Sequence, residues 1–541
     1  MRFGSLLSRI NHKLPLGGLV LAVVAVVGLS SQAPLPGAPA VAHAAGGRPN
    51  IVLIQTDDEA LSQFTRKVMP ETKRLLADHG TFFDDYIVTT SQCCPSRASL
   101  LTGQYAHNHG VMSNQPGYPA LVDKGNVLPV WLQQAGYYTM HVGKYLNNYE
   151  RFADPSSEPA PGWDQWYTLF GSTKYYNYQY AINGTLTHHA DRPGDNATHV
   201  VNRDAVRLIN KRAPRPQPFF LELDERAPHV ATHRDPHGDC RGASQPLKRD
   251  EGTYQSDPTL RMARPPHPPS FNEPDMTDKP AFISAQPKLS PDDRHAIKRH
   301  WSCAAEALRG VDRGVANVYH AVKDAGEIGK TVFLFTSDNG LFYGQHRIAR
   351  GKVLPYGEAL HLPLVIKAPR HYIQGANPHR TIGRPVANID LAPTILAFAH
   401  GSPCAPGEGC RTMDGRSLMP LLSQSGNWPS GRGLLTEYDA SKAGRYATCQ
   451  FDGIRTRSES YVEHTRVVDT NTGDCVSTDQ RERYDLSSDP YELQNLCFGG
   501  EPVSCPVDST QVDLQQRLDQ LRNCSGIRGR DSLGPNHDYC E

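Results

Sequence analysis

One short stretch of this sequence combines a cysteine, a proline and an arginine at a spacing that suits chemistry on an anion. Pro95 follows two residues after Cys93, and proline is favoured in the first turn of a helix because its missing N–H would have no partner there. Cys93 is therefore expected at a helix N-terminus, whose free amides attract anions. Arg97, about one turn further on, can direct its guanidinium at the same place. These residues alone leave open whether Cys93 reacts as a thiolate or forms a disulfide with Cys94.

Four oxygen-bearing side chains form a second candidate. Asp57 and Asp58 follow one apolar run, and Asp338 and Asn339 follow another. Two carboxylates about 4 Å apart repel by about 4 kcal/mol at an effective dielectric of about 20, and a hard divalent cation removes that repulsion. Oxygen-only ligation favours calcium or magnesium over zinc. Since successive side chains on a strand point to opposite faces, Asp57 and Asp58 can share an ion only where the strand breaks. The alternative is that both pairs are turn residues.

The elements that must position these residues alternate along the chain. Apolar, β-branched runs separated by helical stretches are typical of a mainly parallel sheet covered on both faces. Strands are expected at residues 50–55, 138–142, 218–223, 331–335 and 362–366, and helices at residues 69–79, 96–101, 128–135, 197–211, 291–325 and 391–400. Four of these strands lead into Asp57-Asp58, Gly143-Lys144, Pro228-His229 and Asp338-Asn339. Open α/β sheets bind ligands beyond the carboxyl ends of their strands, so the site is predicted there.

Length and charge limit the class of protein. At 541 residues the chain is too long for one ordinary core, so a large domain with a smaller one is expected. Lys+Arg and Asp+Glu are equal at 56 each, which favours neither a nucleic-acid binder nor a polybasic membrane protein. Basic residues, an apolar run and small residues predict a signal peptide over residues 1–44, with no stable membrane insertion after cleavage. An uncleaved anchor is the alternative.

After this leader, we expect a catalytic domain over residues 45–400 and a C-terminal subdomain over residues 401–541. Residues 233–288, rich in proline and polar residues without periodicity, predict a loop insertion over one rim of the sheet. Most of the 12 cysteines lie in the last third, as in small exported domains held by disulfides. Pairing between neighbours, such as Cys404–Cys410 or Cys497–Cys505, fits this pattern, but spacing does not fix the connectivity.

The segment from Cys93 to Gly103 resembles the signature of the type I sulfatases, Cys-x-Pro-Ser-Arg followed by Leu-Thr-Gly, without a gap. In that family the first cysteine is oxidised to formylglycine, whose hydrate is the nucleophile. The register selects Cys93, because Cys94 would need a proline where Ser96 stands. Cys94 is then expected to be a buried neutral thiol. The chain is also similar to the family at residues 50–58, 143–144, 227–229, 336–340, 351–352, 390–394 and 484–496.

The resemblance implies a fold like that of alkaline phosphatase, an α/β sandwich with a large mixed, mainly parallel sheet between helices and a small C-terminal antiparallel-sheet subdomain. Calcium, in preference to magnesium, would be held by Asp57, Asp58, Cys93, Asp338 and Asn339. Arg97, Lys144 and Lys352 would supply positive charge around the sulfate. His229 and Lys352 would contact the bridging oxygen, and either could protonate the leaving group. The implied partners are a small-molecule or glycan sulfate ester and a formylglycine-generating enzyme.

One position departs from the family. Many members read Gly-Lys-Trp-His, whose histidine assists the hydrate, whereas this chain has Leu146 there, so that step needs another group or water. The sequence Gly-Lys-Tyr-Leu-Asn resembles the branch with glucosamine-6-sulfatases and extracellular heparan endosulfatases, and Asn147 is a candidate for the place. His141 is another, although strand alternation predicts it on the face opposite Lys144. His346 is expected either to contact substrate or to be a rim histidine without a role.

These features predict an exported sulfatase of the arylsulfatase or N-acetylglucosamine-6-sulfatase type, which hydrolyses aryl or carbohydrate sulfates. One alternative is a formylglycine-dependent phosphonate or phosphodiester hydrolase. The other is a catalytically silent binder of sulfated glycans, which predicts a broken signature or missing metal ligands, whereas every such position is filled. The signal peptide predicts a secreted protein, and the alanine- and arginine-rich composition favours a bacterial source.

Overall fold

The structure is a computed structural model that describes most of the chain after the predicted leader. The described residues are 47–151, 158–171, 174–231, 240–256, 266–440, 448–469, 472–497, 504–528 and 538–541. The predicted signal peptide at residues 1–44 lies outside them, as do parts of the predicted insertion at residues 233–288. In the described part of the chain, no helix combines the length and the apolar character needed to cross a lipid bilayer.

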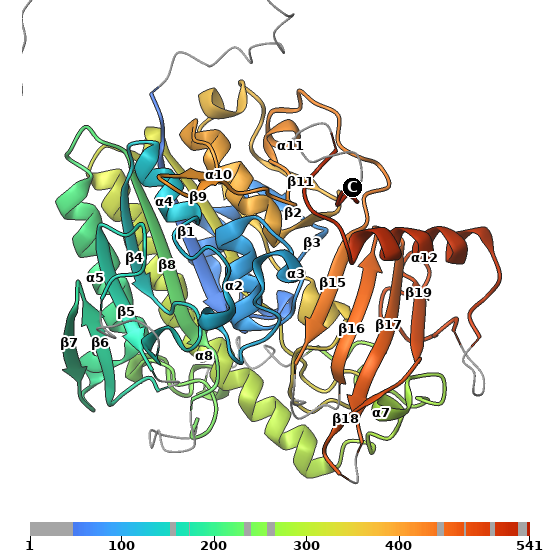
Figure 1. Cartoon of the computed structure of the whole chain (residues 1–541). Coiled ribbons are helices and arrows are strands. Elements are labelled where there is room, and N and C mark those ends of the chain that lie inside the picture. The colour runs from blue at the N-terminus through green and yellow to red at the C-terminus, as the bar shows by residue number, and fades with distance from the viewer. Residues whose placement is uncertain are drawn as a thin grey trace, which may run out of the picture. The chain divides into compact units, whose positions relative to one another are not determined.

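A ten-stranded sheet forms the centre of the fold (Figure 1). Its strands are β1 (Asn50–Asp57), β2 (Thr81–Phe83), β4 (Tyr138–Gly143), β5 (Gln165–Phe170), β6 (Tyr178–Ile182), β7 (Thr185–His189), β8 (Phe219–Pro228), β9 (Thr331–Ser337), β10 (Val365–Lys367) and β11 (Arg380–Ile382). They lie in the order β11-β2-β10-β9-β1-β8-β4-β5-β6-β7. The run from β9 to β5 is parallel, and antiparallel pairs flank it on both sides. The predicted mixed, mainly parallel sheet is confirmed.

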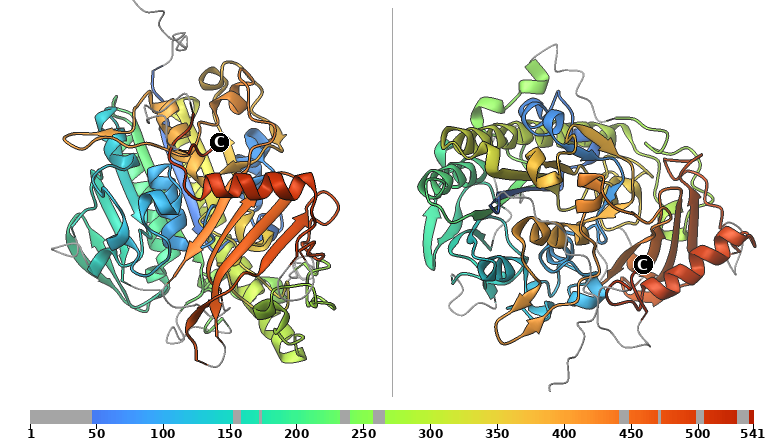
Figure 2. Two further views of the ribbon diagram at one scale, coloured as in Figure 1. Left: turned by 45° about the vertical axis from the view of Figure 1, so that its right-hand side comes forward. Right: turned by 90° about the horizontal axis from the view of Figure 1, so that it is seen from above.

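Helices cover both faces of this sheet (Figures 1 and 2). On one face lie α2 (Cys93–Thr102), α4 (Leu128–Gln134) and α10 (Leu391–Ala399), and on the other lie α1 (Pro70–Leu75), α5 (Ala197–Arg212) and α8 (Pro291–Asp324). Strand side chains alternate between the two layers: Ile51 and Leu53 pack in the core under α2, whereas Val52 and Ile54 pack in the core under α5 and α8. This alternation decides which strand residues can reach α2.

A smaller antiparallel sheet follows in the C-terminal part of the chain, as predicted. Its strands are β15 (Leu434–Asp439), β16 (Thr448–Arg455), β17 (Glu459–Val468), β18 (Cys475–Ser477) and β19 (Arg481–Asp485). Helix α12 (Ser509–Leu521) lies across this sheet, where it contacts β15 and β16 (Figure 1). The domain boundary near residue 400 stays a prediction, since the chain from Gly46 to Glu541 forms one compact unit.

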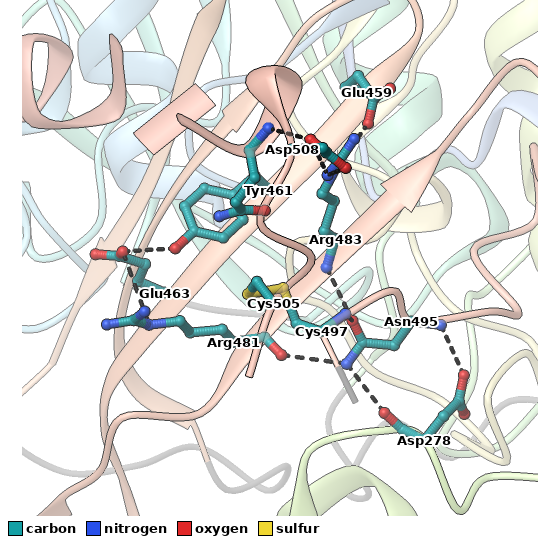
Figure 3. Close-up of a disulfide and its surroundings, with 11 residues drawn as sticks. Asp278, Glu459, Tyr461, Glu463, Arg481, Arg483, Asn495, Cys497, Cys505 and Asp508 are labelled. Atoms are coloured by element: carbon teal, nitrogen blue, oxygen red, sulfur yellow. Dashed lines mark hydrogen bonds and ion pairs between the residues drawn. A yellow bond between two sulfur atoms is a disulfide. The ribbon is translucent and has the colours of Figure 1, made fainter. Parts of the chain in front are cut away.

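Ten of the twelve cysteines form disulfides. The pairs are Cys240–Cys303, Cys404–Cys410, Cys449–Cys475, Cys497–Cys505 and Cys524–Cys540. The two predicted neighbour pairs are among them. Figure 3 shows Cys497–Cys505 beside Arg483 of β19, which donates hydrogen bonds to Asp508, the N-cap of α12, at 2.8 and 3.0 Å. The disulfide and this ion pair together attach the start of α12 to the sheet.

Candidate functional site

The strand β1 ends in two aspartates whose side chains reach the same place. Asp57 is its last residue, and Asp58 has a left-handed backbone with φ of 70°, which breaks the strand. The pairing of β1 with β8 also shifts register between Gln55 and Asp57. As a result, one ligand atom from each of Asp57, Asp58, Cys93 and His229 lies within 4.8 Å of the others. This is the strand break that two successive aspartates require in order to share an ion.

The neighbouring parallel strand β9 brings two more oxygen-bearing side chains to this point. The backbone N–H of Asp58 donates to Asp338 Oδ1 at 3.2 Å, and Asn339 Nδ2 donates to Asp58 Oδ1 at 2.6 Å. Asp338 and Asn339 are both completely buried. The four side chains predicted as metal ligands from two separate strand ends are therefore adjacent in the structure.

Cys93 is the first residue of α2 and is buried, with 1% of its surface exposed. Its thiol donates to Asp57 Oδ1 at 3.4 Å and lies 2.8 Å from Lys352 Nζ. Burial, with help from Asp57, raises the pKa of the Cys93 thiol to about 12 in spite of Lys144 and Lys352. Cys93 and Cys94 are both free, so they form no disulfide. An unmodified Cys93 is a poor nucleophile at neutral pH, because the thiolate is the reactive form.

Two lysines bind the aspartates beside Cys93. Lys144, which follows β4, donates to Asp57 Oδ2 at 2.6 Å. Lys352 forms an ion pair with Asp58 and donates to Asn339 Oδ1 at 3.3 Å. Burial would lower the pKa of each lysine, but the surrounding carboxylates raise both above the ordinary value. Both ammonium groups therefore remain charged at neutral pH.

The same lysines hold the aspartates ionised. Burial alone would raise the pKa of Asp57, yet the charge of Lys144, with that of Lys352 in support, lowers it well below its ordinary value. Lys352 lowers the pKa of Asp58 in the same way against burial. Asp338 lies behind these two, and burial together with the charge of Asp57 raises its pKa to about 6.

His229 follows β8 and is neutral in this setting. Burial lowers its pKa, although Asp57 and Asp58 oppose the change. Its Nδ1 lies 2.7 Å from the Val230 carbonyl oxygen, so the Nδ1–H donates there and fixes the tautomer. The remaining nitrogen, Nε2, lies 3.8 Å from Asp58 Oδ2. His229 therefore offers a lone pair rather than a proton to the site.

Arg97 lies on α2 and is held by two carboxylates. Its Nε donates to Asp338 Oδ2 at 2.8 Å, and its Nη1 donates to Asp224 Oδ1 at 2.7 Å. The side chain is buried and does not line the pocket. We name these grouped residues the charged cluster: Asp57, Asp58, Cys93, Arg97, Lys144, His229, Asp338, Asn339 and Lys352.

The charges around Cys93 fit a divalent cation. The carboxylates that make ion pairs here are Asp57, Asp58, Asp224 and Asp338, and their cationic partners are Arg97, Lys144 and Lys352. Glu222 adds no charge, because burial and Asp224 raise its pKa well above the ordinary value. These ion pairs thus contain one more carboxylate than cationic side chains. A divalent cation together with a singly charged sulfate ester would balance this excess, and the all-oxygen donors suit calcium or magnesium.

A pocket of about 300 Å³ opens at the charged cluster, with Cys93, Lys144, His229 and Lys352 in its lining. The rest of the lining comes mainly from residues 145–151 and 168–171, which we name the pocket wall. Asn147 belongs to the wall, and its Oδ1 has no hydrogen-bond partner among the described residues.

Two histidines considered from the sequence lie outside the pocket lining. His346 is fully buried, with its Nδ1 2.7 Å from Glu273 Oε2 and its ring stacked on Tyr356 at 4.4 Å. The structure therefore does not bring it to the pocket as a substrate contact. His141 is also fully buried, on the sheet face under α2, and its ring packs against Trp166 at 4.7 Å.

Asp224, which contacts the charged cluster, was not predicted from the sequence. Asp224 lies in β8, where it binds Arg97, and Glu222 lies two residues earlier on the same face. The signal for them is two carboxylates at alternate positions in the otherwise apolar run from Phe219 to Asp224. Such residues are almost never fully buried without a partner, so they point to a buried cation nearby.

Comparison with known proteins agrees with this geometry. The model of the Sulfatase family matches residues 49–402, and that of the N-sulphoglucosamine sulphohydrolase C-terminal region matches residues 344–524. The chain is 31% identical to an extracellular sulfatase SULF-1 homolog of Drosophila melanogaster over 71% of its length, but it spans only 32% of that protein. It is 30% identical to an arylsulfatase of Volvox carteri, covering 89% of this chain and 75% of the relative. It is 29% identical to human N-acetylglucosamine-6-sulfatase, covering 88% and 85%.

Solved structures share the fold. A protein determined in complex with its substrate D-glucosamine-2-N,6-O-disulfate superposes with a TM-score of 0.66 at 22% identity, over 88% of this chain and 97% of that one. The phosphonate monoester hydrolase of Agrobacterium radiobacter superposes with a TM-score of 0.59 at 18% identity, over 88% and 95%. At these identities the likeness concerns the fold, and it confirms the expected alkaline-phosphatase-like architecture. The family match over residues 49–402, together with the charged cluster, leads to one conclusion: this chain belongs to the sulfatase family.

Proposed function

We propose that this protein is a sulfatase that hydrolyses sulfate esters, with Cys93 as the precursor of its nucleophile. The observation that carries the proposal is the position of Cys93, which lines the pocket at the start of α2 with its sulfur 2.8 Å from Lys352 Nζ. A thiol with a pKa of about 12 does not supply a nucleophile at neutral pH. Conversion of Cys93 to formylglycine would supply an aldehyde hydrate at this position.

A divalent cation, calcium in preference to magnesium, would complete the site. Its ligands would be Asp57, Asp58, Asp338, Asn339 and the modified residue 93. When bound, the ion would supply positive charge toward the sulfate oxygens and lower the pKa of a coordinated hydroxyl.

The two lysines bind and orient the sulfate group. Both remain protonated among the carboxylates, and both line the pocket beside Cys93. Fixed positive groups in a site with little water stabilise negative charge that develops during transfer. Lys352 is also the proton donor to the leaving oxygen, because His229 is neutral and its Nδ1–H is already committed to Val230. His229 binds the leaving group through Nε2, which accepts a hydrogen bond from a hydroxyl next to the leaving oxygen.

Carbohydrate sulfates are the favoured substrates. The pocket wall presents Asn147, Asn148, Glu150 and Arg151, which can hydrogen-bond sugar hydroxyls, and Phe170, which can pack against a sugar ring. The named activity of the N-acetylglucosamine-6-sulfatase relative supports the same class. Leu146 stands where many members have a histidine. We assign Asn147, the next residue, to substrate binding, and a role in the chemical step is the alternative. The proposal also includes export through the signal peptide at residues 1–44, maturation by a formylglycine-generating enzyme, and a bacterial source.

The test combines mass spectrometry with paired rates. Under reducing and alkylating conditions, the tryptic peptide with Cys93 should lose about 18 Da when cysteine becomes formylglycine. The matured enzyme should turn over an aryl sulfate faster than the matching aryl phosphonate, and chelation should abolish the activity until calcium is restored. Faster phosphonate turnover would favour the phosphonate hydrolase instead. An alkylated, unmodified Cys93 from a host with the modifying enzyme would favour a silent binder of sulfated glycans.

A further inference from the structure

Three polar side chains form a buried group directly behind the charged cluster. His141 lies on β4, and Glu222 and Asp224 lie on the adjacent parallel strand β8, where His141 pairs with Glu222 and Gly143 with Asp224. All three side chains project from the sheet face under α2, and ligand atoms from the three lie within 4.8 Å of one another. None lines the pocket, and each has less than 5% of its surface exposed.

This group is connected to the predicted metal ligands through Arg97. Asp224 Oδ1 accepts from Arg97 Nη1 at 2.7 Å, and Asp224 Oδ2 lies 3.4 Å from His141 Nδ1. On its other side, Arg97 Nε donates to Asp338 Oδ2 at 2.8 Å. Hydrogen bonds therefore connect Asp224 through Arg97 to Asp338, and His141 lies beside Asp224 without a hydrogen bond to it.

The group is poorly suited to bind a cation of its own. Asp224 is already paired with the guanidinium of Arg97, whose positive charge would repel a metal ion. The rings of Tyr145, Trp163 and Trp166 pack around His141 at centroid distances of 5.4, 5.4 and 4.7 Å, so aromatic carbon rather than oxygen ligands surrounds this side of the group. The arrangement instead suits a support for Arg97.

We propose that Asp224, backed by His141, is a positioning residue that divides the charge of Arg97 between two carboxylates and so keeps Asp338 available as a metal ligand. This inference rests on the proposed function, because it concerns the cation of that site. A guanidinium held between two carboxylates has a fixed orientation. Without the charge of Asp224, Arg97 would pair with Asp338 alone, and that tighter pairing would compete with the cation. Loss of the Asp224 charge would also weaken cation binding directly, because one nearby negative charge is removed.

The experiment is a calorimetric titration of calcium into metal-free protein. For Asp224→Asn, calcium affinity should fall by about 10- to 100-fold, as is usual when a partner of a metal ligand is lost. Glu222→Gln is the matched control, because Glu222 lies on the same strand face and is similarly buried, whereas the hydrogen bonds of Arg97 go to Asp224, Asp338 and the Lys144 carbonyl. Its calcium affinity should stay within about twofold of wild type. Asp224→Glu keeps the charge and should recover most of the lost affinity.

Each outcome supports or overturns a stated claim. Asp224→Asn that binds calcium as tightly as wild type would overturn the positioning role while leaving the sulfatase proposal intact. Wild-type protein that binds no divalent cation would overturn the metal in the proposed function, and this inference with it. A purely structural role predicts a lower unfolding temperature of the metal-free variant with unchanged calcium affinity. If Asp224→Asn does not fold, His141→Asn is titrated instead: weaker calcium binding is expected, and unchanged binding would overturn the proposal.

Discussion

The charged cluster and the pocket wall both contribute to the lining of one pocket, but they are built differently. The cluster lies at strand ends and at the start of α2, and its groups are held by ion pairs such as Lys144 to Asp57 at 2.6 Å. The wall consists of segments that follow β4 and β5, and Arg151 and Gly171 within it are exposed. A preorganised charged cluster fixes the reaction type, whereas side chains on loops are free to differ between substrates. Substitutions in the two regions should therefore have different kinetic effects.

The largest effect is expected at Cys93. Cys93→Ser should lower the turnover of an aryl sulfate by at least about 10⁴-fold, because loss of a nucleophile removes most of the catalysis. A serine has only one hydroxyl, so sulfated enzyme would accumulate, which intact mass spectrometry can detect. Cys94→Ser is the matched control: Cys94 is also buried and free but lies outside the pocket lining, so activity should remain within a few-fold. The reverse pattern would contradict the assignment of Cys93.

The next effect concerns the lysines of the charged cluster. Lys352→Ala should lower kcat by about 10²- to 10³-fold, as is typical when one group that stabilises transition-state charge is removed. The loss should be larger for an alkyl sulfate than for an aryl sulfate with an acidic leaving group, because Lys352 is the proposed proton donor. Lys330→Ala, at a lysine exposed on the surface, is the control and should leave kcat unchanged. An equal fall in kcat on both substrates would contradict the assignment of Lys352 as proton donor.

A smaller, substrate-dependent effect is expected in the pocket wall. Asn147→Ala should raise KM for a sulfated amino sugar by about tenfold, the equivalent of one lost hydrogen bond of about 1.4 kcal/mol. The kcat value should change little, and KM for a small aryl sulfate should not change. A fall in kcat on both substrates would instead place Asn147 in the chemical step, as the substitute for the histidine absent at Leu146.

The smallest expected effect concerns stability rather than activity. His107 of α3 (Ala106–His109) lies 3.0 Å from Glu437 Oε2 of β15 and 2.9 Å from the Cys524 carbonyl, so it joins the main sheet region to the C-terminal sheet. Burial opposes its protonation, but Glu437 raises its pKa to about 9. Its stabilisation is thus complete below the unfolded pKa of about 6.5 and lost as pH rises through about 9.

Urea unfolding of His107→Gln tests this pH dependence. The variant should be less stable than wild type by about 2 kcal/mol at pH 6, and the difference should shrink by pH 9.5. His79→Gln, at an exposed histidine, is the control and should follow the wild-type curve. A stability difference independent of pH would mean that His107 contributes packing rather than charge.

The sequence predicted the charged cluster better than its surroundings. Asp57, Asp58, Asp338 and Asn339 were found because each follows an apolar strand, and parallel strands bring their ends together. His346 could not be placed in the same way, since its burial beside Glu273 depends on a loop 73 residues earlier in the chain. Spacing also could not show that Arg97 would be enclosed by Asp224 and Asp338, because Asp224 comes from a strand 127 residues away.

The main sheet was predictable because apolar runs mark its buried strands, the same signal that located the metal ligands at the strand ends. Long apolar runs such as residues 331–335 mark buried strands, and β9 extends this run by only two residues. The strand expected at residues 362–366 is the shorter β10, Val365–Lys367. It runs antiparallel to β9, and a run of apolar residues does not show strand direction. The pocket wall was less predictable, since residues 145–151 owe their position to tertiary contacts such as Tyr145 against Trp166.

The burial of Cys93 sets an order of events in biosynthesis. In the folded chain the thiol lies beside Asp57 and Lys352 with 1% of its surface exposed, which leaves little of it for a second protein to contact. A formylglycine-generating enzyme would have to act on the chain before β1, β9 and α2 come together. Modification would then have to precede folding, and molecules that fold with an intact thiol would stay inactive. The active fraction would depend on the ratio of the modification rate to the folding rate.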